Sequence, residues 1–518
     1  MIARRPFAPP RHHDVFIVVA LAATFLIGPR PGFAGEVWPV GGVRVSPSGV
    51  SSQLGKVAPD GDGGVIVAYA HNVGVDSLVV TKVNASGAIE WGPVEICPSV
   101  NGPSDHVITA DGAGGAVLAW EDRRAGGDPV IYAQRINGSG TTLWAEGGIP
   151  VCSLAGWYVS PIIAPDGAGG AVIAWRCPSP NEPRLRAQRL LANGAVAPGW
   201  NEDSGTAICA VPGESASDHT IAADGSGGAI LAWTDGRAGS TDSIYANRVG
   251  GDGSILWAVN GIEVASDDEV EFREASIVSD GSGGAVIAYH ERTWYTEENR
   301  IHARRINGAG QAQWDSVLCA VAPPDHLKWT WSASDGAGGA VVAWHQKPPG
   351  GGSGSMDVYA RRVDAGGNPL WPDCGVRVST LGDVGTSEVS IAADGGGGAI
   401  LTWHDRTDSF YVLAQHLDGA GNALWQAGGL DLDPGADHPF GPVVTPDGHG
   451  GGLFAWEGDC SVWCVYAQRI LDASIFADGF ESGDTTHWST SVPLLPHPHG
   501  QPFQLSGHNR NLKAGPRG

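Results

Sequence analysis

Short apolar runs alternate with glycine-rich turns along most of the chain. One block recurs throughout: Asp-Gly-x-Gly-Gly, four small or aliphatic residues, and then Trp or Tyr. Its eight copies are spaced 51 to 59 residues apart and begin at Asp60, Asp111, Asp166, Asp224, Asp280, Asp335, Asp394 and Asp447. A steady period of this length is typical of a propeller, a solenoid or another repeat array.

Each repeat contains four short β-rich runs. In the second repeat the first three are DHVITA (105–110), AVLAW (116–120) and VIYAQRI (130–136), and TTLW (141–144) leads into the fourth. Tight turns between the runs favour antiparallel pairing, and a run that is apolar at every position is typical of a strand buried on both faces. We therefore predict an all-β fold, an eight-bladed β-propeller of four-stranded antiparallel blades.

The two ends of the repeat region complement each other. In six repeats, nine residues separate the basic residue that ends the third strand from the next Trp, but after Arg469 the next Trp is Trp488, nineteen residues on. The eighth repeat thus lacks a fourth strand. At the other end, EVWPVGGVRVS (36–46) has the pattern of a fourth strand, but the first three strands of a blade do not precede it. We expect this N-terminal strand to complete the last blade and close the ring.

Aromatic and basic residues recur at fixed places in the repeats. Trp or Tyr ends every second strand, and another Trp stands at the start of every fourth-strand region. A ligand site would not need a copy in every blade, so we interpret these rings as packing between blades. The basic residues that end the third strands, such as Arg135, are expected to form stabilising pairs, with Asp122, Asp235 and Asp405 as candidate partners.

The segments outside the repeats differ from them in composition. Residues 1–34 combine arginines, an apolar run of 14 residues and a small-residue cleavage site, as in a signal peptide. That run is too short to span a bilayer. We expect the propeller to occupy residues 35–472 and a tag-like segment with a disordered tail to occupy residues 473–518. The sequence predicts a secreted or cell-surface monomer with no membrane span.

Composition and charge exclude several classes of partner. The net charge of −24 argues against nucleic acid, because its recognition needs clustered Lys and Arg. The eight cysteines do not have the spacing of a compact disulfide framework, and Cys460 and Cys464 form the best local pair. Zinc-site and EF-hand spacings, phosphate-binding loops and nucleophile elbows do not occur. Asp-His pairs precede the first strands of four repeats, at 105–106, 218–219, 325–326 and 437–438, and could bind a metal, but we interpret them as polar loop residues and predict no metal or cofactor.

The repeat itself resembles known sequences. Its Asp-Gly-x-Gly-Gly-x-x-x-Ala-Trp blade and Tyr-Ala-Gln-Arg strand resemble the repeats of uncharacterised secreted bacterial β-propeller proteins, over residues 36–470. There is also a faint similarity to sialidase-type propellers, whose Asp-box, Ser-x-Asp-x-Gly-x-x-Trp, lies at the turn from the third to the fourth strand. Here that turn reads NGSGTTLW (137–144), without the serine and with the glycine one residue further from Trp. The resemblance implies a fold and not a catalytic site.

The candidate ligand site lies where the repeats differ from one another. Loops that leave second strands and enter first strands share one face, and those at 290–299 and 323–334 concentrate aromatic and acidic residues. The candidate ligand-binding residues are Trp294, Tyr295, Trp329, Trp331, Glu291, Glu298, Asp325 and His326. Sugar rings stack on indole and their hydroxyls bind carboxylates, which favours a glycan. Alternatively, Trp331 points into the ring of blades and Trp294 covers the edge of one blade, and neither binds a ligand.

Two functions remain open. We expect a non-catalytic recognition or scaffold protein that binds an extracellular glycan or protein. The alternative is a carbohydrate-active enzyme, a sialidase-like glycoside hydrolase or a lyase, with two carboxylates around one bond. No catalytic residue is assigned, and Glu291 and Glu298 are the first carboxylates to test if turnover is observed.

Overall fold

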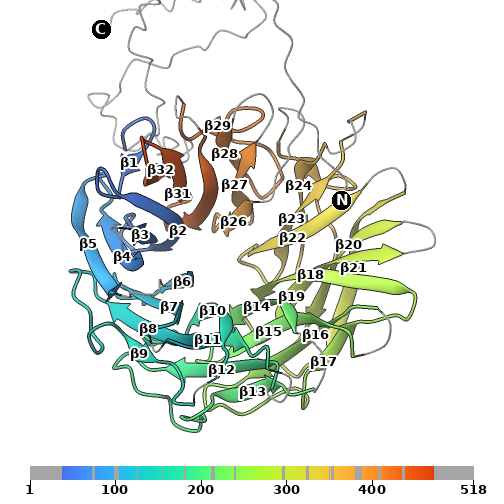
Figure 1. The fold of residues 1–518 in the computed structure, drawn as a ribbon. Coiled ribbons are helices and arrows are strands. Elements are labelled where there is room, and N and C mark those ends of the chain that lie inside the picture. The colour runs from blue at the N-terminus through green and yellow to red at the C-terminus, as the bar shows by residue number, and fades with distance from the viewer. Residues whose placement is uncertain are drawn as a thin grey trace, which may run out of the picture. The chain divides into compact units, whose positions relative to one another are not determined.

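Eight four-stranded sheets follow one another around a ring (Figure 1). The described part of the chain contains no helix, and therefore none that could cross a membrane. The predicted signal peptide and C-terminal segment lie outside the described residues. The computed structural model describes residues 38–471, which belong to one compact unit. Within that range it does not describe residues 73–75, 99–103, 125, 155, 180–182, 212–215, 238–240, 294–297, 323–325, 349, 352–354, 380–387, 406–409 and 435–437.

Blades 1 to 4 each contain four consecutive antiparallel strands. Blades 1 and 2 consist of β2 (Ser51–Pro59), β3 (Val65–Asn72), β4 (Asp76–Val83) and β5 (Ile89–Pro98), then β6 (Ser104–Ala110), β7 (Ala116–Asp122), β8 (Val130–Ile136) and β9 (Ile149–Pro150). Blades 3 and 4 consist of β10 (Val159–Pro165), β11 (Ala171–Arg176), β12 (Leu185–Leu190) and β13 (Thr206–Cys209), then β14 (Ser217–Ala223), β15 (Ala229–Asp235), β16 (Ser243–Val249) and β17 (Ile262–Ala265).

Blades 5 to 7 repeat this order, and blade 8 takes one strand from the N-terminal end of the described chain. Blades 5 and 6 consist of β18 (Val270–Ser279), β19 (Ala285–Thr293), β20 (Asn299–Ile306) and β21 (Ala312–Val321), then β22 (Leu327–Ser334), β23 (Ala340–Gln346), β24 (Asp357–Val363) and β25 (Val376–Arg377). Blades 7 and 8 consist of β26 (Val389–Ala393), β27 (Ala399–Asp405), β28 (Tyr411–Leu417) and β29 (Leu430–Asp431), then β30 (Phe440–Pro446), β31 (Gly452–Asp459), β32 (Trp463–Ile470) and β1 (Val43–Arg44).

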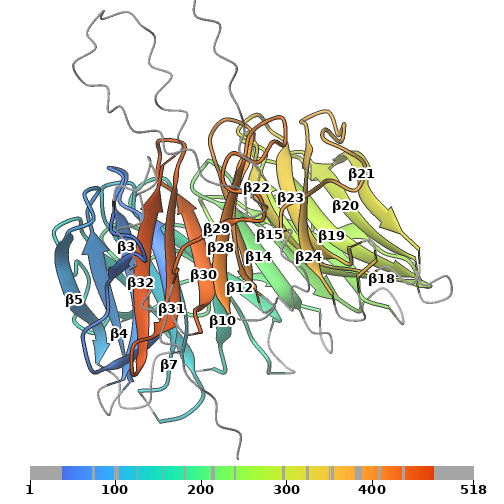
Figure 2. The same cartoon turned by 90° about the horizontal axis from the view of Figure 1, so that it is seen from above.

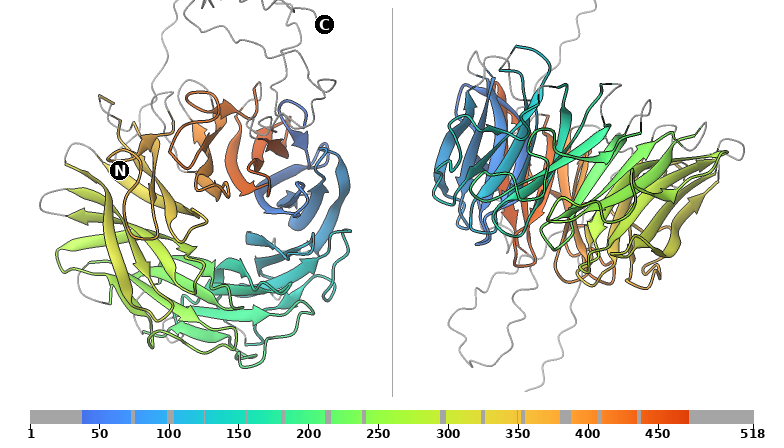
Figure 3. Two further views of the ribbon diagram at one scale, coloured as in Figure 1. Left: turned by 180° about the vertical axis from the view of Figure 1, so that it is seen from behind. Right: turned by 90° about the horizontal axis from the view of Figure 1, so that it is seen from below.

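The strands run across the thickness of the ring (Figure 2). The first strand of every blade lies at the inner edge of its sheet, and these first strands surround the centre in both face views (Figures 1 and 3). We call the face at which first strands begin and second strands end the upper face. The Asp-Gly-x-Gly-Gly turns lie on the opposite, lower face.

Pairing between the two ends of the repeat region closes the ring. Val43 of β1 pairs with Ala467 of β32, so the N-terminal strand is the outer strand of blade 8 (Figure 1). Trp38 is buried, and its indole Nε1 donates a hydrogen bond to the Ala85 carbonyl of blade 1 at 3.1 Å. The predicted fold and its closure are confirmed.

The recurring tryptophans pack between blades. Trp233 at the end of β15, for example, shares an apolar cluster with Val172 and Leu185 of the preceding blade. The tryptophans of the fourth-strand regions donate their indole N–H to a carbonyl of the next blade, at 2.8 to 3.1 Å, in Trp38, Trp91, Trp144, Trp200, Trp257, Trp314 and Trp371. The packing interpretation of these residues is confirmed.

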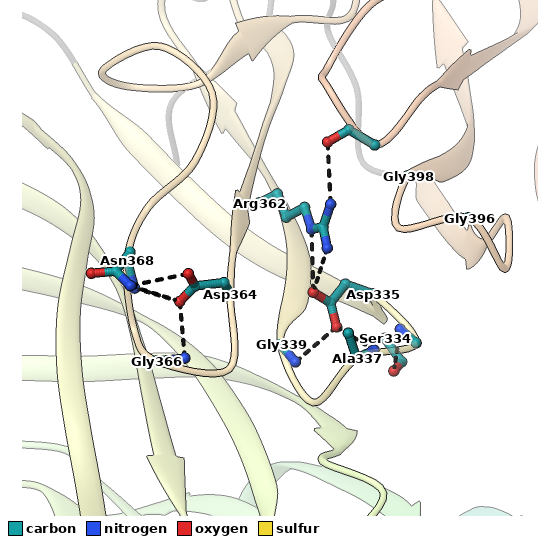
Figure 4. Close-up of polar contacts among 12 residues, drawn as sticks. Ser334, Asp335, Ala337, Gly339, Arg362, Asp364, Gly366, Asn368, Gly396 and Gly398 are labelled. Atoms are coloured by element: carbon teal, nitrogen blue, oxygen red, sulfur yellow. Dashed lines mark hydrogen bonds and ion pairs between the residues drawn. The ribbon is translucent and has the colours of Figure 1, made fainter.

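Each turn aspartate contacts the basic residue of its own blade, as an ion pair with Lys or Arg in seven blades and as a contact with His416 in blade 7; Figure 4 shows the pair of blade 6. In blade 6, Asp335 accepts hydrogen bonds from the N–H groups of Ala337 and Gly339 and pairs with Arg362 at 3.0 Å. Arg362 also donates to the Gly419 carbonyl of blade 7 at 3.2 Å, so the pair links two blades. We call this arrangement the blade latch; the corresponding pairs are Lys82–Asp60, Arg135–Asp111, Arg189–Asp166, Arg248–Asp224, Arg305–Asp280, His416–Asp394 and Arg469–Asp447.

The predicted partners of these basic residues were therefore wrong. Asp122 lies opposite Val130, at the upper end of the β7–β8 ladder, whereas Arg135 lies near its lower end. Asp122 instead accepts the indole N–H of Trp120 at 2.9 Å and pairs with Arg124 at 2.6 Å. The length of the strand separates the two ends and decides which aspartate is within reach.

In six blades the fourth strand begins later than its tryptophan suggests, whereas Trp91 and Trp314 lie within β5 and β21. In blade 2, β9 starts five residues after Trp144, because Gly147 and Gly148 turn the chain in between. Gly148 has a φ of +85°, and a Cβ there would lie 2.5 Å from the ring of Trp120. Only glycine fits this close approach in a left-handed conformation.

Disulfide bonds join two pairs of cysteines. Cys460 and Cys464, the local pair expected from the sequence, are bonded, and so are Cys319 and Cys374. Burial raises the pKa of the Cys97 thiol to about 12, which makes it a poor nucleophile. The cysteines of the described chain that form no disulfide bond are all buried: Cys97, Cys152, Cys177 and Cys209.

Candidate functional site

The first strands carry a recurring irregularity where they begin at the upper face. The position lies six residues before the turn aspartate, at or beside a shift in strand register. Non-glycine residues seldom adopt a positive φ, and those that do gather at functional sites. Five blades place such a residue here: Asp105 (φ 48°), Ser160 (54°), Asp218 (46°), Glu274 (59°) and Trp329 (51°).

Blades 5 and 6 interlock through these bulges. The hydroxyl of Thr330, the residue after Trp329, donates to the backbone carbonyl of Glu274. The Ser276 hydroxyl donates to the Thr330 hydroxyl at 3.1 Å. A bulge re-aims the side chain that it carries. These contacts therefore fix where Glu274 and Trp329 stand on the upper face.

Glu274 is a half-buried carboxyl group that faces two partners. Its Oε2 accepts the backbone N–H of Trp329 and lies 3.7 Å from Nδ1 of His290. Burial raises the pKa of Glu274 to about 7 against the opposing effect of the Trp329 hydrogen bond, and the neighbouring Asp218 carboxylate raises it further. Glu274 therefore keeps a proton at pH values where an ordinary glutamate has lost it.

His290 is uncharged at neutral pH. Its Nε2 lies 3.0 Å from Oδ1 of Asn299, and burial lowers its pKa to about 4. A neutral imidazole can both donate and accept hydrogen bonds. Together, His290 and Glu274 give the upper face a polar pair without a fixed charge at slightly acid pH.

Three rings of blade 6 contact one another at the upper end of β22 and β23. The Trp329 ring is 6.4 Å from that of Trp331, and His345 contacts both at 5.3 and 5.0 Å between centroids. Trp329 is 36% exposed, whereas Trp331 packs against the apolar cluster between blades 6 and 7. We call these three residues the Trp329 platform. Its exposed surface is mainly that of one indole.

The predicted acids Glu291 and Glu298 do not join Glu274. Adjacent strand residues point to opposite faces of a sheet, so Glu291 faces away from the side on which His290 meets Glu274. Glu291 is buried and pairs at 2.6 Å with both Arg300 and His302. Glu298 lies 2.7 Å from the same Arg300. Both carboxylates belong to an ion-pair network of blade 5.

That network holds a charged histidine. Against the lowering effect of burial, the carboxylates of Asp315 and Glu291 raise the pKa of His302 to about 9. The ring of His302 stacks on Tyr289 at 5.1 Å between centroids. The imidazolium is therefore part of the blade packing and is not presented to a ligand.

The remaining predicted residues are placed only in part. Trp294, Tyr295 and Asp325 lie outside the described residues, and His326 is exposed just before β22. Across the described ranges, no group of three or more His, Cys, Asp or Glu is positioned to hold a metal ion. Glu274 was missed in the sequence, although it occupies the same place relative to the turn aspartate as Asp218.

Comparisons with known proteins find similarity only among solved structures. No protein-family model matches the chain, and no curated protein matches it. One similar structure is an ulvan lyase, with 11% identity, 84% of this chain and 96% of that chain covered, and a TM-score of 0.43. Another is the BP39L lectin from Burkholderia pseudomallei, with 14% identity, 73% of this chain and 99% of that chain covered, and a TM-score of 0.42. The Hadza microbial sialidase Hz136 is also similar, with 13% identity, 78% of this chain and 73% of that chain covered, and a TM-score of 0.36. The likeness is one of fold alone. It does not bear on function, which has to be argued from the site.

Proposed function

We propose that this propeller is an exported recognition protein that binds a glycan on the upper face, at the Trp329 platform. The observation that carries the proposal is the indole of Trp329, 36% exposed on a residue with a φ of 51°. Four other blades have a positive φ at this position and carry a polar residue there, so the bulge does not require an aromatic ring. Exposure of an indole that the fold does not require is typical of a binding surface.

The chemistry around Trp329 suits a sugar. An indole face packs against the C–H face of a pyranose ring, while the hydroxyls of the sugar need donors and acceptors close by. Glu274, which accepts the backbone N–H of Trp329, and His290, which faces Glu274, are polar groups of this kind next to the bulge. In the other seven blades the position of Trp329 holds no aromatic residue, so the platform occurs at one place in the ring.

Trp329→Ala is expected to weaken glycan binding about tenfold or more, because a stacking contact of about 1.4 kcal/mol is lost. Screening on an array of neutral and acidic oligosaccharides would identify a ligand, and calorimetry would give the affinities. Trp157→Ala, which removes another exposed indole (46%) in the segment before β10, is the matched control and should bind like the wild type. A ligand whose affinity survives Trp329→Ala, and Trp294→Ala with it, would refute this site.

One observation favours an enzyme as the second candidate. A carboxyl group that keeps its proton near pH 7, beside a second carboxylate, is the arrangement of a general acid in glycoside hydrolysis. Glu274 has the raised pKa, to which the charge of Asp218 contributes, whereas Glu291 and Glu298 are held in ion pairs.

If the protein hydrolyses a glycan, turnover should fall as the pH rises through about 7, because Glu274 then loses the proton that it donates. Glu274→Gln should lower the turnover number by about a hundredfold or more. Glu298→Gln, the control, should leave it unchanged. Full turnover by Glu274→Gln, measured as release of reducing ends, would end the enzyme hypothesis for this site.

A further inference from the structure

A second group of rings lies at the junction of blades 7 and 8. Phe410, just before β28, stacks on His404 at 5.6 Å and meets His438, just before β30, edge-on at 4.6 Å between centroids. Phe410 is 38% exposed, and His438 is exposed as well. All three residues lie where second strands end or where first and third strands begin, which places them on the upper face.

The rings continue onto blade 8. Phe440 follows His438 by two residues at the start of β30, and its ring lies 4.7 Å from that of Trp463, edge-on. Trp463 begins β32, so it too stands at the upper end of its strand. Both rings are partly exposed.

The Trp329 platform and this second group lie at consecutive blade junctions, on the two sides of blade 7. Trp331 packs against the apolar cluster between blades 6 and 7, and so does Tyr411. Tyr411 is the residue next to Phe410. We call the series Trp329, Trp331, Phe410, Phe440 and Trp463 the aromatic arc. It crosses three consecutive blades, which lie side by side in the ring (Figure 1).

The length of the arc exceeds one sugar unit. Sheets that pack face to face lie about 10 Å apart, so three blades span on the order of 20 Å. A single sugar ring covers one indole or phenyl face. Rings repeated over that span therefore fit a chain of several sugar units.

The charge of the surroundings indicates which kind of chain. The aromatic side chains of the arc carry no charge, and burial lowers the pKa of His345 to about 3, so it is neutral as well. The protein as a whole has a net charge of −24, which repels polyanions. An uncharged polysaccharide meets no such opposition.

We propose that the ligand is a linear neutral polysaccharide, bound along the aromatic arc from blade 6 to blade 8. This inference rests on the proposed function and extends it from a single contact to a chain-length requirement. Affinity should rise with the number of sugar units until the chain reaches Trp463, and sulfated or uronate polymers should bind more weakly.

The test compares the two ends of the arc. Xylan, galactomannan, arabinan and mixed-linkage β-glucan, with alginate as the polyanion, serve as probes in affinity gel electrophoresis. Disaccharides and hexasaccharides of the retained polymer follow in calorimetry. The distal variant is Phe410→Leu, Trp463→Leu, which keeps an apolar side chain at both positions and removes the ring faces. Trp329→Ala tests the platform, and Trp157→Ala is the control.

We expect the distal variant to lose about tenfold or more in hexasaccharide affinity and nothing in disaccharide affinity, whereas Trp329→Ala loses both. A distal variant that binds the hexasaccharide like the wild type, while Trp329→Ala does not, would overturn the arc and leave the proposed function standing. Unchanged binding in both variants would overturn both. Retention by alginate alone, or by none of the polymers, would overturn the neutral polysaccharide.

Discussion

Deletion of residues 36–46 is expected to destabilise the propeller by about 5 kcal/mol or more and to make it aggregate. The deletion removes β1 and Trp38, and with them the buried side chains of Trp38 and Val45. Burial of two such side chains stabilises a protein by several kcal/mol. The unpaired edge of β32 would then offer its backbone N–H and C=O groups to another chain.

The matched control for this deletion is truncation at the other end. Removal of residues 475–518 should leave the melting temperature unchanged, because the β32 and β1 strands stay in place. Melting would be followed by circular dichroism and aggregation by light scattering. Equal melting of the 36–46 deletion and the full-length protein would show that β1 does not hold the ring closed.

Arg362→Ala is expected to lower the free energy of unfolding by about 3–5 kcal/mol, the usual cost of leaving one partner of a buried ion pair alone. The Asp335 side chain is fully buried, and Arg362 is its ionic partner as well as a donor to the next blade (Figure 4). Urea unfolding, monitored by tryptophan fluorescence, measures the loss.

The same figure supplies the control, Asp364→Ala. Asp364 also caps a glycine turn, accepting the N–H groups of Gly366 and Asn368 at 2.9 Å, but it lies at the surface and forms no latch (Figure 4). Its loss should cost about 1 kcal/mol. The double variant Asp335→Asn, Arg362→Met should recover part of the stability that Arg362→Ala loses, since no charge is left buried. Equal losses for Arg362→Ala and Asp364→Ala would contradict the latch.

The architecture could be predicted because its signals are repeated. The turn motif sets the period, the apolar second strands show that both faces of a blade are covered, and Trp38 and Arg469 lie at ends that complete one repeat. The partner of Arg135 could not be predicted from spacing. Asp111 and Asp122 are both near it in the sequence, and only the register of β7 on β8 shows which one is at the same end.

The candidate site could be predicted less completely. Trp329 and Trp331 were identified because blade 6 departs from the other repeats in aromatic content. Glu274 was missed because its position becomes distinctive only through a bulge, which the pattern of apolar residues does not reveal. Glu291 was included because it lies in the right loop region, but strand alternation directs its side chain to the other face of the blade.

The closing strand also imposes an order on folding. Ser46 accepts the backbone N–H of Val465 across 419 residues, a separation close to the full length of the ring. A chain that emerges from its N-terminus exposes β1 first and supplies β32 last. The strand β1 therefore remains unpaired until the seven following blades and β32 have been synthesised. Contacts between residues so distant in the sequence form slowly, so we expect the final step of folding to be the slowest and the open ring to be the species most exposed to aggregation.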